Sequence, residues 1–178
     1  SHANWQANMR AYVYRKLMWD SSLNAEVLLN EYIDLFYGMA ADAVRRLMEL
    51  FHENYRSLID GGKDVTFITR GTHTEAEMNP KEMLEECIAI LERAEDDVLC
   101  SNASQKYKRE MHERLEQVKA TPLMLLVDHF EEYYPNEPVR RKKYFHEYSK
   151  CVREGKLDTS GERWSMLQYL NEIGCTEI

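Results

Sequence analysis

Apolar side chains recur every three or four residues along almost the whole chain, and the residues that interrupt helices stand between these periodic stretches. All seven glycines and three of the four prolines fall between or at the ends of the stretches, where backbone freedom and a missing N–H group cost least. Such a pattern is typical of long helices joined by few turns. At 178 residues, 44% of them hydrophobic, the chain is long enough for one sizeable core. We therefore predict an all-α bundle of six to eight helices forming a single domain over residues 1–178.

Caps and breakers place the ends of these helices. The predicted helices cover about 5–18, 24–38, 40–59, 79–99, 102–133, 139–153 and 162–173. Asn24 is predicted to cap the second helix, and Gly38 to end it in a left-handed conformation. The pair Asn79-Pro80 predicts a capped helix start. Pro122 is predicted to kink or break the helix over 102–133.

One long irregular loop is predicted at about 61–79, between Gly61-Gly62 and Asn79. Within it, Val65–Thr69 has the β-branched and aromatic content of a short strand. Because no second strand is evident, we expect an extended loop, with pairing to another part of a longer protein as the alternative.

The net charge of −8 repels phosphate backbones, so nucleic-acid binding is disfavoured. The basic run Arg140–Lys143 reads as a solvated helix face. No apolar stretch reaches the roughly 18 residues of a membrane span. The four cysteines form no C-x-x-C pair and are predicted to be free thiols, although the spacing leaves a Cys151–Cys175 disulfide open.

Two clusters have the side chains of a metal site, and both are more simply explained as helix surface. Glu49 and His52 have the Glu-x-x-His spacing of di-iron bundles, but the chain has no second copy of it. Asp128, His129 and the Glu131-Glu132 pair fall within one helical turn, as polar helix faces often do. We therefore predict no metal, no cofactor and no catalytic residue, and whether a longer parent protein is an enzyme stays open.

A small set of residues suits contact with a neighbouring domain or a carbohydrate. Trp19 stands at the exit of a helix beside Asp20, where its ring can fill a helix junction or face a partner. Polar side chains of the irregular loop suit ligand contact as well. The candidate contact residues are Trp19, Asp20, Tyr37, Arg70 and His73.

The N-terminal part of the chain carries a longer motif. It consists of Tyr12, Lys16-Leu17-Met18-Trp19-Asp20, Leu28-Leu29, Glu31-Tyr32 and Phe36-Tyr37-Gly38-Met39-Ala40-Ala41. This pattern resembles the start of the C-terminal helical region of an uncharacterised bacterial glycoside-hydrolase-like family, a domain of unknown function related to β-N-acetylhexosaminidases and α-glucuronidases. Ser21 stands where that family usually has proline. The resemblance is most specific over 9–55, about a quarter of the chain.

In that family the helical region follows a (β/α)8 barrel, which holds the catalytic residues. The resemblance therefore implies that this chain is a fragment of a larger multidomain protein, a non-catalytic module that packs against an upstream barrel in a protein acting on polysaccharide or glycan. It implies a secreted, periplasmic or cell-surface parent, while the compartment of the fragment itself stays open. The alternative is a stand-alone helical domain that binds another protein.

Overall fold

The computed structural model of the chain describes residues 5–63 and 76–157. All regular structure in this part is helical, which confirms the all-α prediction. The helices are α1 (Gln6–Trp19), α2 (Ala25–Tyr37), α3 (Ala41–Asp60), α4 (Lys81–Cys100), α5 (Gln105–Asp128), α6 (Phe130–Tyr133) and α7 (Pro138–Glu154), with one-turn 3-10 helices η1 (Gly38–Ala40) and η2 (Ala76–Met78). The strand-like segment at 65–69 and the helix predicted over 162–173 lie outside the described residues.

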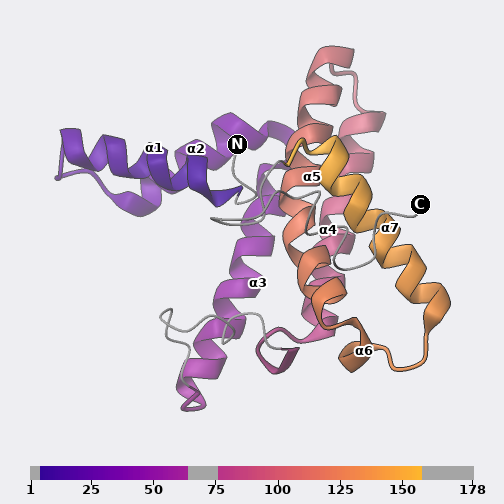
Figure 1. The fold of residues 1–178 in the computed structure, drawn as a ribbon. Coiled ribbons are helices and arrows are strands. Elements are labelled where there is room, and N and C mark those ends of the chain that lie inside the picture. Colours follow the sequence, from indigo (N-terminus) through magenta and orange to yellow (C-terminus); the bar gives the residue numbers. More distant parts are fainter. Residues whose placement is uncertain (1–4, 64–75, 158–178) are drawn as a thin grey trace.

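The helices divide into a bundle and an arm (Figure 1). In the bundle, α5 packs against both α4 and α7, and α3 packs against α4. The arm, defined here as α1, α2 and the turn between them, projects away from α4, α5 and α7 (Figure 1). Two hydrophobic clusters form the core, one among α4, α5, α6 and α7 and the other where α1, α2, α3, α4 and α5 meet. The half-buried side chains of Phe51 and Met83 pack against both clusters.

The ends of α2 follow the sequence prediction. The side-chain carbonyl of Asn24 accepts hydrogen bonds from the backbone N–H groups of Glu26 and Val27, at 2.8 and 3.1 Å. These bonds satisfy two of the donors that a helix start leaves without partners. At the other end Gly38 has a φ of 47°, in the region that favours glycine.

The predicted Asn79 cap of α4 is wrong. Pro80 occupies the cap position, and no side chain caps the first turn. Asn79 instead lies buried, and its backbone carbonyl accepts a hydrogen bond of 2.7 Å from the hydroxyl of Tyr133. Tertiary contact therefore determines the conformation of Asn79 more than its capping propensity does.

Pro122 does not break α5, so the break that was one of its two predicted effects is wrong. The helix is continuous from Gln105 to Asp128, and Pro122 is buried within it. An interior proline costs about 3 kcal/mol, because it removes one backbone hydrogen bond and crowds the carbonyl four residues earlier. The fully buried Leu123 and Leu126 belong to the core cluster shared with α4 and α7, and their burial offsets this cost.

The base of the arm is fixed to the bundle. Arg114 on α5 donates a hydrogen bond to the backbone carbonyl of Phe36, and its guanidinium lies 4.2 Å from the centre of the Phe36 ring. The hydroxyl of Tyr107, also on α5, accepts a hydrogen bond of 3.0 Å from the backbone N–H of Met39. The ring of Tyr37 is buried against Trp5 and Phe36. These contacts hold the base of the arm and leave its far end without bundle support.

Candidate functional site

Exposed apolar side chains gather on the arm. Seven of the ten large apolar side chains that stand exposed in the described residues lie in or just after it: Tyr14, Met18, Trp19, Leu23, Val27, Leu35 and Met39. Three of these are exposed by 73% or more, namely Met18 (87%), Trp19 (94%) and Leu35 (73%). Scattered apolar residues are normal on a protein surface, but here most of those exposed in the described residues belong to one projecting element.

Trp19 and Asp20 have different roles at the end of the arm. The indole of Trp19 is almost wholly open to solvent. The carboxylate of Asp20 accepts hydrogen bonds from the hydroxyl and the backbone N–H of Ser22, at 2.7 and 2.9 Å, and these bonds lower the pKa of Asp20. Asp20 therefore shapes the turn that presents Trp19.

A groove runs along α1. Its volume is about 580 Å³, within the range of ligand-binding clefts. The lining residues are Asn8, Ala11, Tyr12, Arg15, Lys16, Trp19, Leu23 and Tyr32. Trp19 is thus both an exposed residue and part of a groove with aromatic and basic side chains.

The other candidate contact residues do not join this surface. Tyr37 is only 1% exposed and belongs to the core at the base of the arm. Arg70 and His73 lie outside the described residues. Of the five candidate contact residues, Trp19 therefore lies on the exposed surface of the arm, and Asp20 stabilises the turn beside it.

A second candidate site lies between α4, α5 and α7. We call it the polar cluster, and it comprises Glu95, His112, Glu116, Lys119 and Glu154. The residues at 112, 116 and 119 share one face of α5, because side chains three and four positions apart are neighbours on a helix. Glu95 reaches the cluster from α4 and Glu154 from α7.

The contacts in the polar cluster are close. His112 uses both ring nitrogens: Nδ1 contacts Oε1 of Glu95, and Nε2 lies 2.8 Å from Oε2 of Glu154. The ammonium of Lys119 forms an ion pair with Glu116 and lies 3.5 Å from Oε2 of Glu95. Glu116 is 0% exposed. One polar network therefore links three helices, from the buried Glu116 to the exposed Glu154.

A pocket of about 310 Å³ opens beside the cluster. Five carboxylates and two lysine ammonium groups line it: Glu92, Glu95, Asp96, Glu116, Glu147, Lys119 and Lys150. Leu123 and Cys151 complete the lining. The excess of negative charge favours cations in this pocket.

The chemistry of the lining does not favour nucleophilic catalysis. Burial raises the pKa of the Cys151 thiol, and the adjacent carboxylate of Glu116 adds to this effect. A thiol with a raised pKa carries little thiolate, the reactive form. Burial alone lowers the pKa of the Lys119 ammonium, but the neighbouring Cys151, Glu116 and Glu95 outweigh it and hold this pKa above its usual value.

Glu95 and Glu116 converge, but their partners do not suit a glycosidase pair. Glycoside hydrolysis requires one carboxyl group to be protonated so that it can act as an acid. Here Glu116 is paired with Lys119, and Glu95 contacts both His112 and Lys119. Both carboxyl groups are therefore already engaged with basic side chains of the cluster.

His112 makes the stability of the protein depend on pH. Burial lowers the pKa of His112, but its bonds to Glu95 and Glu154 outweigh this, so the folded pKa lies above the usual 6.5. A raised folded pKa means that stabilisation by the protonated ring is complete below about pH 6.5 and is lost as pH rises through the folded value. In urea unfolding with a chelator, from about pH 6 to about pH 9, the stability advantage of the wild type over His112→Gln should shrink as pH rises. A constant difference between the two proteins would contradict this assignment.

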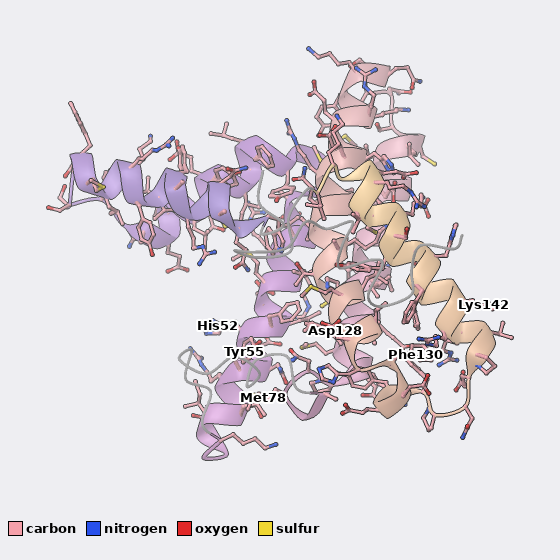
Figure 2. All side chains as sticks on the ribbon, in the orientation of Figure 1. His52, Tyr55, Met78, Asp128, Phe130 and Lys142 are labelled. Carbon is pink, nitrogen blue, oxygen red and sulfur yellow. The ribbon has the colours of Figure 1, made fainter. Side chains whose placement is uncertain are left out.

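The two clusters considered from sequence lie apart, and the second one lines a pocket of about 310 Å³ where α5, α6 and α7 meet. Figure 2 shows His52 on α3 and Asp128 at the end of α5, on separate helices. Arg46 pairs with Glu49, and the side chain of His52 is exposed. Nδ1 of His129 lies 3.0 Å from Oε1 of Glu132, so this pair forms a local contact.

Sequence reasoning missed the polar cluster. Its visible signal is the pair His112 and Glu116, four residues apart on one helix. Glu95 and Glu154 come from helices 17 and 42 positions away from His112. Only the packing of α4 and α7 on α5 brings these carboxylates to the histidine.

A match to a known family lies in the N-terminal segment that contains the arm. Residues 1–49 match the family model of a domain of unknown function (DUF4838). This segment contains the whole arm, η1 and the first part of α3. Nothing among curated proteins or solved structures matches the chain. The match shows that the N-terminal segment is similar to a family of unknown function, over the region where the motif lies.

A helix that spans a membrane is long and predominantly apolar. Within the described residues, no helix is both long and apolar enough to cross a bilayer.

Proposed function

We propose that this chain is a non-catalytic C-terminal helical module of a glycoside-hydrolase-like protein acting on polysaccharide or glycan. In this proposal the arm packs against an upstream (β/α)8 barrel of the same polypeptide. The observation that carries it is the concentration of exposed apolar side chains on the arm, in the segment that matches the family model. The link to glycoside hydrolases comes from the sequence resemblance over the same residues.

The energetics of the arm favour a partner surface. Burying a side chain the size of Trp19, Met18 or Leu35 contributes about 1.5–3 kcal/mol each, relative to leaving it in water. Interfaces between domains of one chain bury about 600–1,500 Å². A helical hairpin that is fixed at its base and carries exposed apolar side chains is suited to such a contact, because little conformational entropy is lost when it docks.

A second candidate function uses the same surface. The groove along α1, with Trp19 and Tyr12 in its lining, favours a stand-alone domain that binds a helix of another protein. The exposed indole of Trp19 also suits stacking on a sugar ring, which would place the arm at the edge of a glycan site.

Hydrogen exchange of the parent protein tests the proposal. Amides of the arm should exchange at least about tenfold more slowly in the parent than in this chain, because docking suppresses local opening of the arm. A parent carrying Met18→Ser, Trp19→Ser and Leu35→Ser should lose most of this protection. Val139→Ser is the matched control, because Val139 is 83% exposed on α7, far along the chain from the arm.

Two results would contradict the proposal: a reading frame that encodes no barrel upstream, or equal exchange of the arm in both proteins. Saturable binding of a helical ligand along α1 in a protein without a barrel would instead support the stand-alone domain.

A further inference from the structure

The environment of His112 requires a cation. With one proton on Nε2, donated to Glu154 at 2.8 Å, the neutral ring turns the lone pair of Nδ1 toward Oε1 of Glu95. Two acceptor atoms repel each other unless a positive charge lies between them. The positive charge is either a proton, which makes the ring an imidazolium, or a metal ion.

We propose that the polar cluster is a binding site for a divalent transition-metal ion of the zinc class, with Nδ1 of His112 and the carboxylates of Glu95 and Glu116 as ligands. A ligand atom of each of these three residues lies within 4.8 Å of the other two. Zinc binds imidazole nitrogen and carboxylate oxygen at about 2.0–2.2 Å. Small side-chain adjustments therefore bring all three atoms onto one ion, and the ring loses one proton to solvent on binding.

Glu116 provides an independent reason for a ligand here. Its carboxylate is fully buried, and within the described residues no group other than Lys119 and Cys151 donates to either oxygen. Its contacts are the ion pair with Lys119 and the neighbouring thiol of Cys151. A buried carboxylate normally has its acceptor positions filled, and a metal ion would fill one of those that remain.

Glu154 supports the ring as metal sites require. A metal-binding histidine usually donates its second N–H to a carboxylate, which fixes the tautomer and the ring orientation. Nε2 of His112 lies at hydrogen-bonding distance from Glu154, leaving Nδ1 as the ligand atom. Lys150 lies 3.6 Å from the same carboxylate oxygen and holds Glu154 in place.

The ammonium of Lys119 competes with the ion for the carboxylates of Glu95 and Glu116. It contacts both proposed carboxylate ligands, so it neutralises the site of the metal-free protein. The adjacent pocket offers it other carboxylates, those of Glu92, Asp96 and Glu147. The same pocket provides an entry path for the ion and room for a water as fourth ligand.

Calorimetric titration of chelator-treated protein with ZnCl₂ tests the site, with the absorption spectrum of bound Co²⁺ as a second readout. The wild type should bind one ion. Glu116→Gln should weaken binding at least about tenfold, and Glu154→Gln by roughly 10- to 100-fold. Glu92→Gln is the matched control, since Glu92 lines the pocket but lies outside the polar cluster, and it should leave the affinity within about twofold. Circular dichroism establishes that each variant folds.

Lys119→Met separates a metal site from a purely structural ion pair. Removing the competing ammonium should tighten zinc binding by about tenfold or more, because a like charge is lost from the site. The proposal is overturned if the wild type shows no saturable binding, or if Glu116→Gln and Glu92→Gln bind equally well. Unchanged affinity in Lys119→Met would also overturn it.

Discussion

Replacing Lys119 with methionine should lower the free energy of unfolding of the metal-free protein by about 3–5 kcal/mol. Glu116 is 0% exposed and Lys119 is its ion-pair partner, so the substitution leaves a buried carboxylate without its cation. The apolar part of the methionine side chain fills similar space, so the loss comes from charge and not from packing. Urea unfolding at neutral pH with a chelator measures the effect.

Two further variants test the cause of this loss. Lys106→Met, on an exposed part of the same helix, should change stability by less than about 0.5 kcal/mol. The double variant Glu116→Met, Lys119→Met should recover most of the loss, because both buried charges are gone. A cost below about 1 kcal/mol for Lys119→Met alone would show that Glu116 does not depend on this ion pair.

Gly38→Ala should destabilise the fold by about 1–3 kcal/mol. Gly38 joins the arm to the bundle with a φ of 47° and a ψ of −115°, a conformation that L-residues rarely adopt. A Cβ at this position would also lie 2.5 Å from the hydroxyl of Tyr107. That hydroxyl holds the backbone N–H of Met39, so it cannot move away without loss of the bond. Thermal or urea unfolding measures the change.

Gly62→Ala is the matched control for Gly38→Ala. Gly62 also has a positive φ, of 78°, but a Cβ there would meet nothing within 4 Å. Its cost should therefore be the backbone term alone, about 1 kcal/mol. Adding Tyr107→Phe to Gly38→Ala should restore part of the loss by removing the crowded oxygen. Equal costs at Gly38 and Gly62 would show that crowding by Tyr107 contributes nothing.

The helices and their class were predictable because they depend on local pattern. Asn24 and Gly38 define α2 through bonds and dihedral angles within a few residues of themselves. The two wrong predictions, a side-chain cap at Asn79 and a break at Pro122, concern residues whose surroundings come from distant parts of the chain. For Pro122, the gain from packing α5 between α4 and α7 outweighs the local cost, which sequence pattern cannot measure.

The candidate sites were predictable to different degrees. Trp19 stood out because a tryptophan at a helix end interrupts the apolar period, and the structure places it in solvent. The buried position of Tyr37 depends on Trp5, which precedes α1 and packs edge-on against its ring. The polar cluster depends on the register of three helices, so its five residues do not read as one site in the sequence.

The bundle does not need the side chains at the far end of the arm. Met18 and Trp19 are almost wholly exposed, so truncating them should change stability by no more than about 0.5 kcal/mol. Natural selection for a folded bundle would therefore allow polar residues at both positions. If relatives keep large apolar side chains at these two positions while their other exposed positions vary, the cause is binding to a partner surface and not folding.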